Sequence, residues 1–204
     1  MRSAFIVLLL ALAVAILALA LTGWANPFAH GGTLNVAATP AIQPGGAAGA
    51  EVAMELSSPD FPAGASIPKA FTADGADSSP ALAFSGAPAG TRAFALIVDD
   101  PDAPVGLWVH WVVFNLPATL SGLAPNEPRA ATLANGAKQG RNSWSRLGWN
   151  GPAPPPGRPH RYFFKLYALD GPLDLEPGAT AQMVEAAMKG RVLAQASLMG
   201  SYGR

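Results

Sequence analysis

The chain has 204 residues, the size of a single domain whose core is large enough to fold without disulfide bonds. Its 13 basic and 13 acidic residues balance, so no overall positive field favours binding to nucleic acid. It contains no cysteine, which excludes disulfides, thiol catalysis and thiolate metal sites.

The amino terminus has the pattern of a targeting segment. Arg2 precedes an uninterrupted apolar run over residues 4–21. That run is longer than the apolar region of a usual signal peptide, about 7–15 residues, and just reaches the about 17–25 residues that span a bilayer. With a small residue at Ala25 as a cleavage point, residues 1–25 are predicted to be a cleaved signal peptide or a retained membrane anchor. Either outcome predicts export to the periplasm or another extracytoplasmic space, tethered to the inner membrane if the segment is retained.

Two further regions follow along the chain. Residues 26–50 are rich in Ala, Gly, Pro and Thr and carry no charge, which predicts a flexible tether. Residues 51–204 are predicted to form the folded domain.

Strand patterns dominate this domain. The predicted extended segments are residues 52–56, 92–98, 108–116, 161–169 and 191–201. In the third of them, strict alternation places these residues on one face: Trp108, His110, Val112, Phe114 and Leu116. A helix is predicted from the Thr180 cap to about Lys189. These elements favour a mainly β fold, a β-sandwich with one or two peripheral helices.

The polar residues that carry chemistry lie where loops meet strands. Asp100 and Asp102 flank a proline, and in an extended segment alternate carboxylates share a face. Like charges so close resist joint ionisation unless a cation or a donor lies between them, and His110 and His160 are the obvious donors. Two imidazoliums held by carboxylates can bind a phosphate or carboxylate group, aided by backbone amides of the Gly151–Gly157 loop.

Each feature alone also has a structural interpretation. The Asp-Pro-Asp-Ala-Pro segment, residues 100–104, is an ordinary turn sequence. His110 can be a core histidine whose hydrogen bonds are satisfied within the protein. The proline-rich loop can be a stiff connector. Two histidines with one aspartate can also form a facial metal triad, which keeps a metal-assisted hydrolase as an alternative.

The motifs in order are more specific than any one of them. Asp-Pro-Asp-Ala-Pro is followed by Trp-x-His on a strand, then by Gly-Pro-x-Pro-Pro-x-Gly and His-Arg-Tyr. This order resembles the phosphatidylethanolamine-binding protein family, most of all its bacterial Raf-kinase-inhibitor-like branch, over residues 51–204.

The resemblance implies a Greek-key β fold with a small anion pocket at one end. Asp100, His110 and His160 match the family's pocket residues, and the positions on its wall match Pro104, Trp108, Gly151 and Tyr162. With Asp102 added from the residue argument, these are the predicted ligand-binding residues.

The leading functional prediction is non-catalytic binding of a small anionic or phosphoryl-bearing ligand, with phospholipid headgroups and so membrane lipid among the candidates. The first alternative is an inhibitor or regulator of a protease- or kinase-type protein partner, and the second is the hydrolase above. No cofactor and no resident metal are expected.

Overall fold

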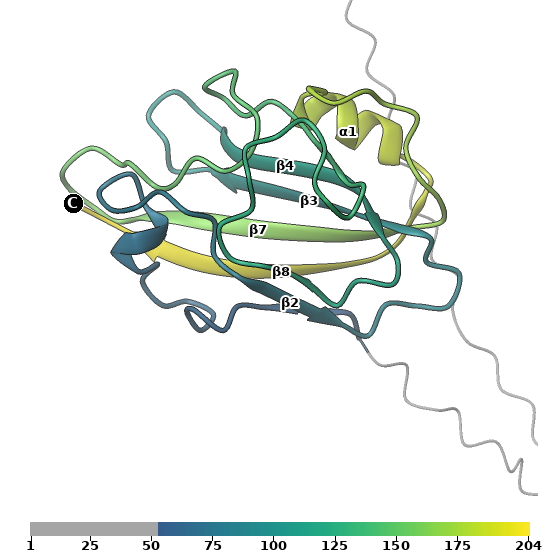
Figure 1. The fold of residues 1–204 in the computed structure, drawn as a ribbon. Coiled ribbons are helices and arrows are strands. Elements are labelled where there is room, and N and C mark those ends of the chain that lie inside the picture. Colours follow the sequence, from purple (N-terminus) through teal and green to yellow (C-terminus); the bar gives the residue numbers. More distant parts are fainter. Residues whose placement is uncertain (1–52) are drawn as a thin grey trace, which may run out of the picture. The chain divides into compact units, whose positions relative to one another are not determined.

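The structure is a computed structural model, and it describes residues 53–204. The predicted targeting segment 1–25 and the tether 26–50 lie outside the described residues. Two antiparallel sheets form a β-sandwich, and one α-helix covers the outer face of the larger sheet (Figure 1). The predicted mainly β sandwich with a peripheral helix is confirmed.

The strands divide unequally between the two sheets. The smaller sheet has the order β1-β2-β5, with bounds Glu55–Ser57, Leu82–Ser85 and Gly122–Leu123. The larger sheet has the order β6-β4-β3-β7-β8, with bounds Lys138–Gln139, Trp108–Pro117, Ala93–Asp100, His160–Leu169 and Val192–Tyr202. A short 3-10 helix, η1, spans Lys69–Phe71, and α1 spans Ala181–Met188.

Two apolar clusters lie on the two faces of the larger sheet. One fills the space between the sheets, and the other packs under α1. β3 contributes to both clusters, and all eight of its residues are buried. A strand buried on both faces favours a continuous apolar run, which explains why residues 93–98 lack the alternation of a half-exposed strand; the two buried residues that follow are Asp99 and Asp100.

The alternation predicted for the third segment is wrong. Val98 of β3 pairs with Trp111 of β4, and the next residue of β3, Asp99, pairs with Val109. His110 of β4 therefore has no residue opposite it. A second irregularity lies at Asn115, which has a φ of +58°. Because each bulge shifts the pleat by one residue, Val112 and Phe114 pack under α1 while Leu116 joins the core between the sheets.

The predicted helix is confirmed within a residue at each end. The Thr180 Oγ1 accepts a hydrogen bond from the backbone N–H of Met183 at 3.3 Å, which caps the helix. Val184 and Met188 are buried against the sheet. In this part of the chain no helix is both long and apolar enough to cross a membrane.

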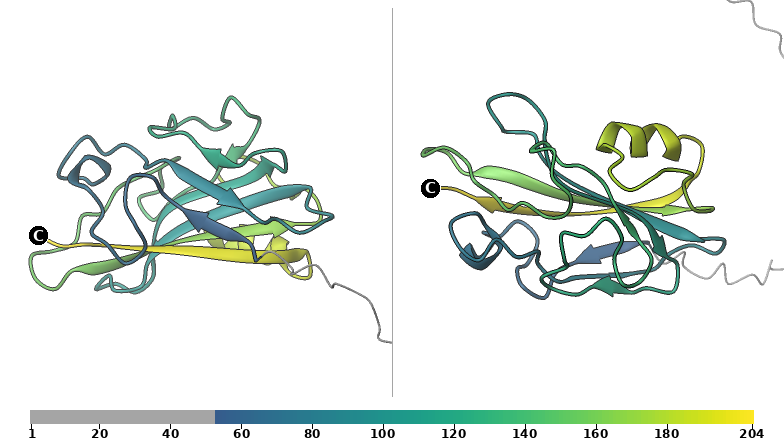
Figure 2. Two further views of the ribbon diagram at one scale, coloured as in Figure 1. Left: turned by 90° about the horizontal axis from the view of Figure 1, so that it is seen from below. Right: turned by 45° about the horizontal axis from the view of Figure 1, so that its top comes forward.

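One end of the larger sheet collects chain segments that are distant in sequence. β3 ends at Asp100 beside the start of β7, because the two strands are antiparallel neighbours. His160 pairs with Tyr202 near the carboxyl terminus of β8, so the chain end lies there too (Figure 2). The loops that cross this end of the sheet surround a cavity.

Candidate functional site

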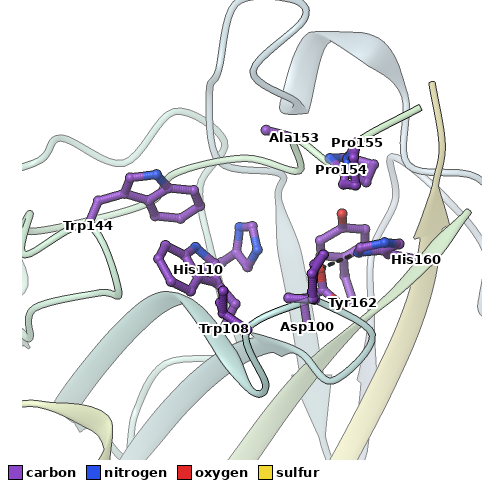
Figure 3. A pocket seen from close by; sticks show the side chains of 12 residues that line it. Asp100, Trp108, His110, Trp144, Ala153, Pro154, Pro155, His160 and Tyr162 are labelled. Carbon is purple, nitrogen blue, oxygen red and sulfur yellow. Dashed lines mark hydrogen bonds and ion pairs between the residues drawn. The ribbon is translucent and has the colours of Figure 1, made fainter. Parts of the chain in front are cut away.

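The cavity has a volume of about 220 Å³ and opens at that end of the sheet (Figure 3). Its lining includes six of the eight residues predicted from the sequence: Asp100, Pro104, Trp108, His110, His160 and Tyr162. The other lining residues are mostly apolar, so a few polar groups lie on an apolar wall. This composition is typical of small-molecule pockets.

Asp100 and His160 meet because β3 and β7 are neighbours. The Nδ1 of His160 lies 2.8 Å from the Oδ2 of Asp100, and both side chains are at least nine-tenths buried. The Oδ1 of Asp100 accepts a hydrogen bond from the backbone N–H of Asp102 at 2.8 Å. Both carboxylate oxygens are therefore occupied within the protein, and the Nε2 of His160 has no partner among the described residues.

His110 enters the cavity from the bulge in β4. Its Nδ1 lies 2.6 Å from the carbonyl oxygen of Asn150. A carbonyl only accepts, so Nδ1 carries the proton and the Nε2 of the neutral ring is an acceptor. Burial lowers the pKa of His110, more than the Asn150 carbonyl and Asp100 raise it, so the ring is neutral at neutral pH. The idea of two imidazoliums, each held by a carboxylate, is therefore wrong for His110.

Aromatic rings fix the orientation of His110. The rings of Trp144 and Tyr162 both meet the imidazole edge to face, each with centroids 5.1 Å away. Trp144 lies in a loop whose backbone N–H groups are bound by the Asn142 side chain, and the Ser143 hydroxyl accepts from the N–H of Val109. The loop is thereby attached to β4 next to the bulge.

The hydroxyl of Tyr162 is an unsatisfied group in this cavity. The oxygen is buried and has no hydrogen-bond partner among the described residues. Burial is the main cause that raises the pKa of Tyr162, and the nearby Asp100 carboxylate raises it further, so the hydroxyl keeps its proton and remains a donor. A buried hydroxyl without a partner costs about 1–3 kcal/mol, which a ligand oxygen would recover.

The proline-rich loop forms one wall. Ala153, Pro154 and Pro155 face the cavity. The Nη1 of Arg204 donates to the carbonyl of Pro154 at 3.3 Å, and Asp74 binds the same guanidinium at 2.6 and 2.8 Å. The carboxyl-terminal residue thus holds the wall in place.

Two of the predicted site residues do not line the cavity. Asp102 binds the guanidinium of Arg161 through two bonds of 2.9 Å, and it also accepts from the Arg161 N–H. These bonds hold the pKa of Asp102 well below its usual range. The predicted sharing of one face by Asp100 and Asp102 is wrong, because the turn directs Asp102 outward to the arginine.

Gly151 lies behind the wall. Its N–H donates to the Oδ1 of Asp77 at 2.7 Å. A Cβ built on Gly151 would stand 2.4 Å from the carbonyl oxygen of Phe71, so only glycine fits this close approach. The residue shapes the loop without facing the cavity.

Sequence reasoning missed several lining residues. Trp144 and Val105 lie in loops without periodicity, and nothing local marked them as neighbours of His110. The Asn142-Ser143-Trp144 triplet was the available signal, since Asn and Ser side chains bind neighbouring backbone groups and so fix the turn that carries the tryptophan.

The fold and the cavity together define a β-sandwich domain with a polar pocket at one end of its larger sheet. The chain belongs to the phosphatidylethanolamine-binding protein family, whose sequence model matches residues 57–203.

Relatives and solved structures agree with this membership. The chain is 51% identical over 138 residues to a UPF0098 protein of Methanothermobacter thermautotrophicus, covering 68% of this chain and 91% of that protein. The structure resembles that of CT736, a phosphatidylethanolamine-binding protein homologue from Chlamydia trachomatis, with a TM-score of 0.69 and 40% identity over 75% of this chain and 99% of that one. It also resembles YbcL of E. coli, with a TM-score of 0.70 and 32% identity over 74% and 98% of the two chains.

Proposed function

We propose that the protein binds a small phosphoryl-bearing anion in this cavity, of the size of phosphoethanolamine, without transforming it. The unpartnered hydroxyl of Tyr162 is the observation that carries the proposal. It is a donor fixed in a partly apolar site, where a hydrogen bond to an oxyanion contributes about 1.5–3 kcal/mol.

The two histidines supply different chemistry to such a ligand. The Nε2 of His160 projects from a ring whose positive charge, when present, is balanced by Asp100. The Nε2 of neutral His110 accepts, and it donates only after the ring takes up a proton. The cavity therefore suits a phosphoryl group that carries both a negative oxygen and a proton. The apolar walls beside Trp108 and Trp144 suit the carbon part of the same ligand.

Binding is favoured over catalysis by the residues that surround the cavity. Within residues 53–204, the lining residues include none of the Ser, Thr, Cys and Lys side chains that most often act as nucleophiles. Over the described residues 53–204, no three His, Asp or Glu side chains cluster closely enough to hold a metal ion. The two-His-one-Asp cluster of the hydrolase alternative is not among such groups, and both oxygens of its aspartate, Asp100, already accept hydrogen bonds within the protein.

The test removes one oxygen atom. The test variant is Tyr162→Phe. Tyr167→Phe is the matched control, because Tyr167 lies on the same strand but on the opposite face of the sheet. Calorimetric titration with phosphoethanolamine, and separately with inorganic phosphate, measures their affinities. We expect Y162F to weaken binding roughly tenfold or more and Y167F to bind like the parent.

Stability gives a second readout. Because the Tyr162 hydroxyl is unsatisfied, Y162F is expected to melt at or above the temperature of the parent, so weaker binding cannot be attributed to unfolding. If Y162F binds both ligands as the parent does, the proposed site is wrong. Binding of phosphoethanolamine but not phosphate would show that the organic part is required.

A regulatory role toward a protein partner is a second candidate, and one observation favours it. Val105 and Leu107 are 77% and 57% exposed on the loop at the rim of the cavity. Exposed apolar side chains beside a polar pocket are typical of interaction sites. Inhibition of members of a serine-protease panel, lost in a Val105→Ser, Leu107→Ser variant that still binds phosphoethanolamine, would support this role. Absence of inhibition by the parent would discard it for that class.

A further inference from the structure

The outer edge of β8 differs from the other sheet edges of the described domain. β8 has 11 residues and ends the larger sheet, where it forms one margin of the molecule in the left view of Figure 2. The other edge strands within residues 53–204 are β6, β1 and β5, and they have two, three and two residues. In the described part of the chain, only β8 presents a long edge.

The backbone of β8 shows which groups point outward. The carbonyl of Met199 accepts from the N–H of Gly64 at 2.7 Å, and Ser201 exchanges bonds of 2.9 and 2.7 Å with Ala65 and Ile67. Alternate residues of a strand direct their N–H and C=O groups to the same side. By this alternation Gln195 and Ser197 also direct theirs outward, and no backbone group within residues 53–204 pairs with them there.

The open part of the edge lacks the usual protection. From Val192 to Leu198 the sequence has no charge and no proline, and Val192 and Leu193 are 42% and 45% exposed. Sheet edges are normally guarded by lysine, proline, a bulge or short length. The Gly64–Ile67 segment guards only the carboxyl-terminal part. Within residues 53–204, the stretch from Ala194 to Leu198 therefore stays unguarded beyond the bulge at Leu193.

We propose that this edge pairs with the same edge of a second copy, antiparallel, with the two-fold axis beside Ala196. In that register Gln195 lies opposite Ser197 of the second copy, and the reverse pair follows from symmetry. The two outward N–H and two outward C=O groups of each copy are then all paired, in four hydrogen bonds across the axis. A second copy is the favoured occupant because the stretch is complementary to itself and brings no charge to the interface.

The position of the chain's own segments limits this interface. The Gly64–Ile67 segment already occupies the edge from Met199 onward, so pairing cannot extend past Leu198. The interface is therefore short, and we expect a weak dimer whose population rises with protein concentration. The cavity lies around the start of β7, beside the carboxyl-terminal part of β8, so the pairing leaves ligand binding unchanged.

The absence of native cysteine makes cross-linking a clean first test. Ala196 would face itself in a non-hydrogen-bonded pair, where Cα atoms are about 4.5 Å apart, within the about 4.4–6.8 Å of a disulfide. In the full chain under mild oxidation, we expect Ala196→Cys to form a covalent dimer. Met183→Cys is the matched control for random collision, since Met183 is 51% exposed on α1. Equal cross-linking of the two variants would overturn the proposal.

A charge exchange provides an independent test. The double variant Gln195→Lys, Ser197→Lys places lysines opposite each other in the dimer, and the corresponding Glu variant does the same with carboxylates. Each alone is expected to weaken self-association roughly tenfold in analytical ultracentrifugation, and an equimolar mixture is expected to restore it. A parent that stays monomeric at every concentration, or a mixture that fails to associate, would contradict pairing through β8. Coverage of the edge by the chain's own residues before 53 would give that monomeric result.

Discussion

His110 and His160 contribute to one cavity but are held in different ways. His160 is bound through Nδ1 by the carboxylate of Asp100 at 2.8 Å. His110 is bound through Nδ1 by the neutral carbonyl of Asn150 at 2.6 Å, and its burial lowers its pKa. The partner of Nδ1 therefore differs between the two rings: it is a charged carboxylate for His160 and a neutral carbonyl for His110. Of two identical side chains, His160 is therefore paired with a carboxylate, whereas His110 is buried beside a carbonyl and is neutral until a proton arrives.

Removal of the carboxylate should have the largest effect on this difference. Asp100→Asn leaves His160 beside a neutral amide, so a positive ring there would lose its compensating charge. We expect phosphoethanolamine affinity to fall at least roughly tenfold and the melting temperature to fall as well. Calorimetric titration and thermal unfolding measure the two effects.

Asp102→Asn is the matched control for that variant. Asp102 lies two residues further along, is bound by Arg161 and does not face the cavity. Its replacement is expected to leave affinity near that of the parent. Equal losses in the two variants would show that general negative charge, and not the Asp100–His160 pair, supports binding.

The second prediction concerns proton uptake by His110. Since the ring is neutral when the cavity is empty, binding an anion should draw a proton onto it. Sulfate is the suitable probe, because its charge is constant over the range of the experiment. Affinity for sulfate should rise as the pH falls through the histidine range, with net proton uptake seen by calorimetry in buffers of different ionisation enthalpy.

His110→Asn separates this uptake from other groups. Its amide retains a donor for the Asn150 carbonyl but cannot take up a proton. The pH dependence of sulfate affinity should therefore become flatter in H110N. A parent profile that is already flat would show that His110 does not change charge on binding.

The third prediction concerns stability without ligand. The pKa of His110 in the folded protein lies below the ordinary value of 6.5, so the unfolded chain binds its proton more tightly. The contribution of the neutral ring is therefore fully present above pH 6.5 and is lost as the pH falls below that value towards the folded pKa. Denaturant unfolding should show this loss in the parent and a smaller one in H110N. A stability that rises on mild acidification would contradict the neutral assignment.

The smallest expected effect is at the cavity wall. The Arg204 guanidinium, with help from the Tyr202 hydroxyl, lowers the pKa of Asp74 to about 2. Asp74 therefore stays ionised between about pH 5 and 8, and the pH dependence of binding does not come from it. Asp74→Asn is expected to weaken binding slightly, by loosening the wall, and to keep the shape of the pH profile. A changed shape would assign part of the titration to this contact.

Local sequence patterns predicted much of the fold. The extended segment predicted over 161–169 is a strand, His160–Leu169, and its alternation places Tyr162, Phe164 and Leu166 in the core between the sheets. The Thr180 cap placed the start of the helix correctly. These predictions succeeded because a two-residue pleat and a capping side chain are set within a few residues of the chain.

The failures share a physical cause. The bulges at His110 and Asn115 depend on how β4 pairs with β3, which the sequence of either strand alone does not reveal. Asp102 turned outward because Arg161, distant in the chain, binds it. Trp144 reached His110 through a loop attached to β4 by Ser143.

The sequence by itself therefore determined which residue types stand at the strand ends, the mainly β architecture and, through the order of its motifs, the family. Only the tertiary structure decided that Asp100 pairs with His160 and that a carbonyl holds His110. It also decided that the Tyr162 hydroxyl is buried without a hydrogen-bond partner from residues 53–204. Strand patterns come from neighbours along the chain, whereas the protonation and orientation of a buried side chain come from neighbours in space.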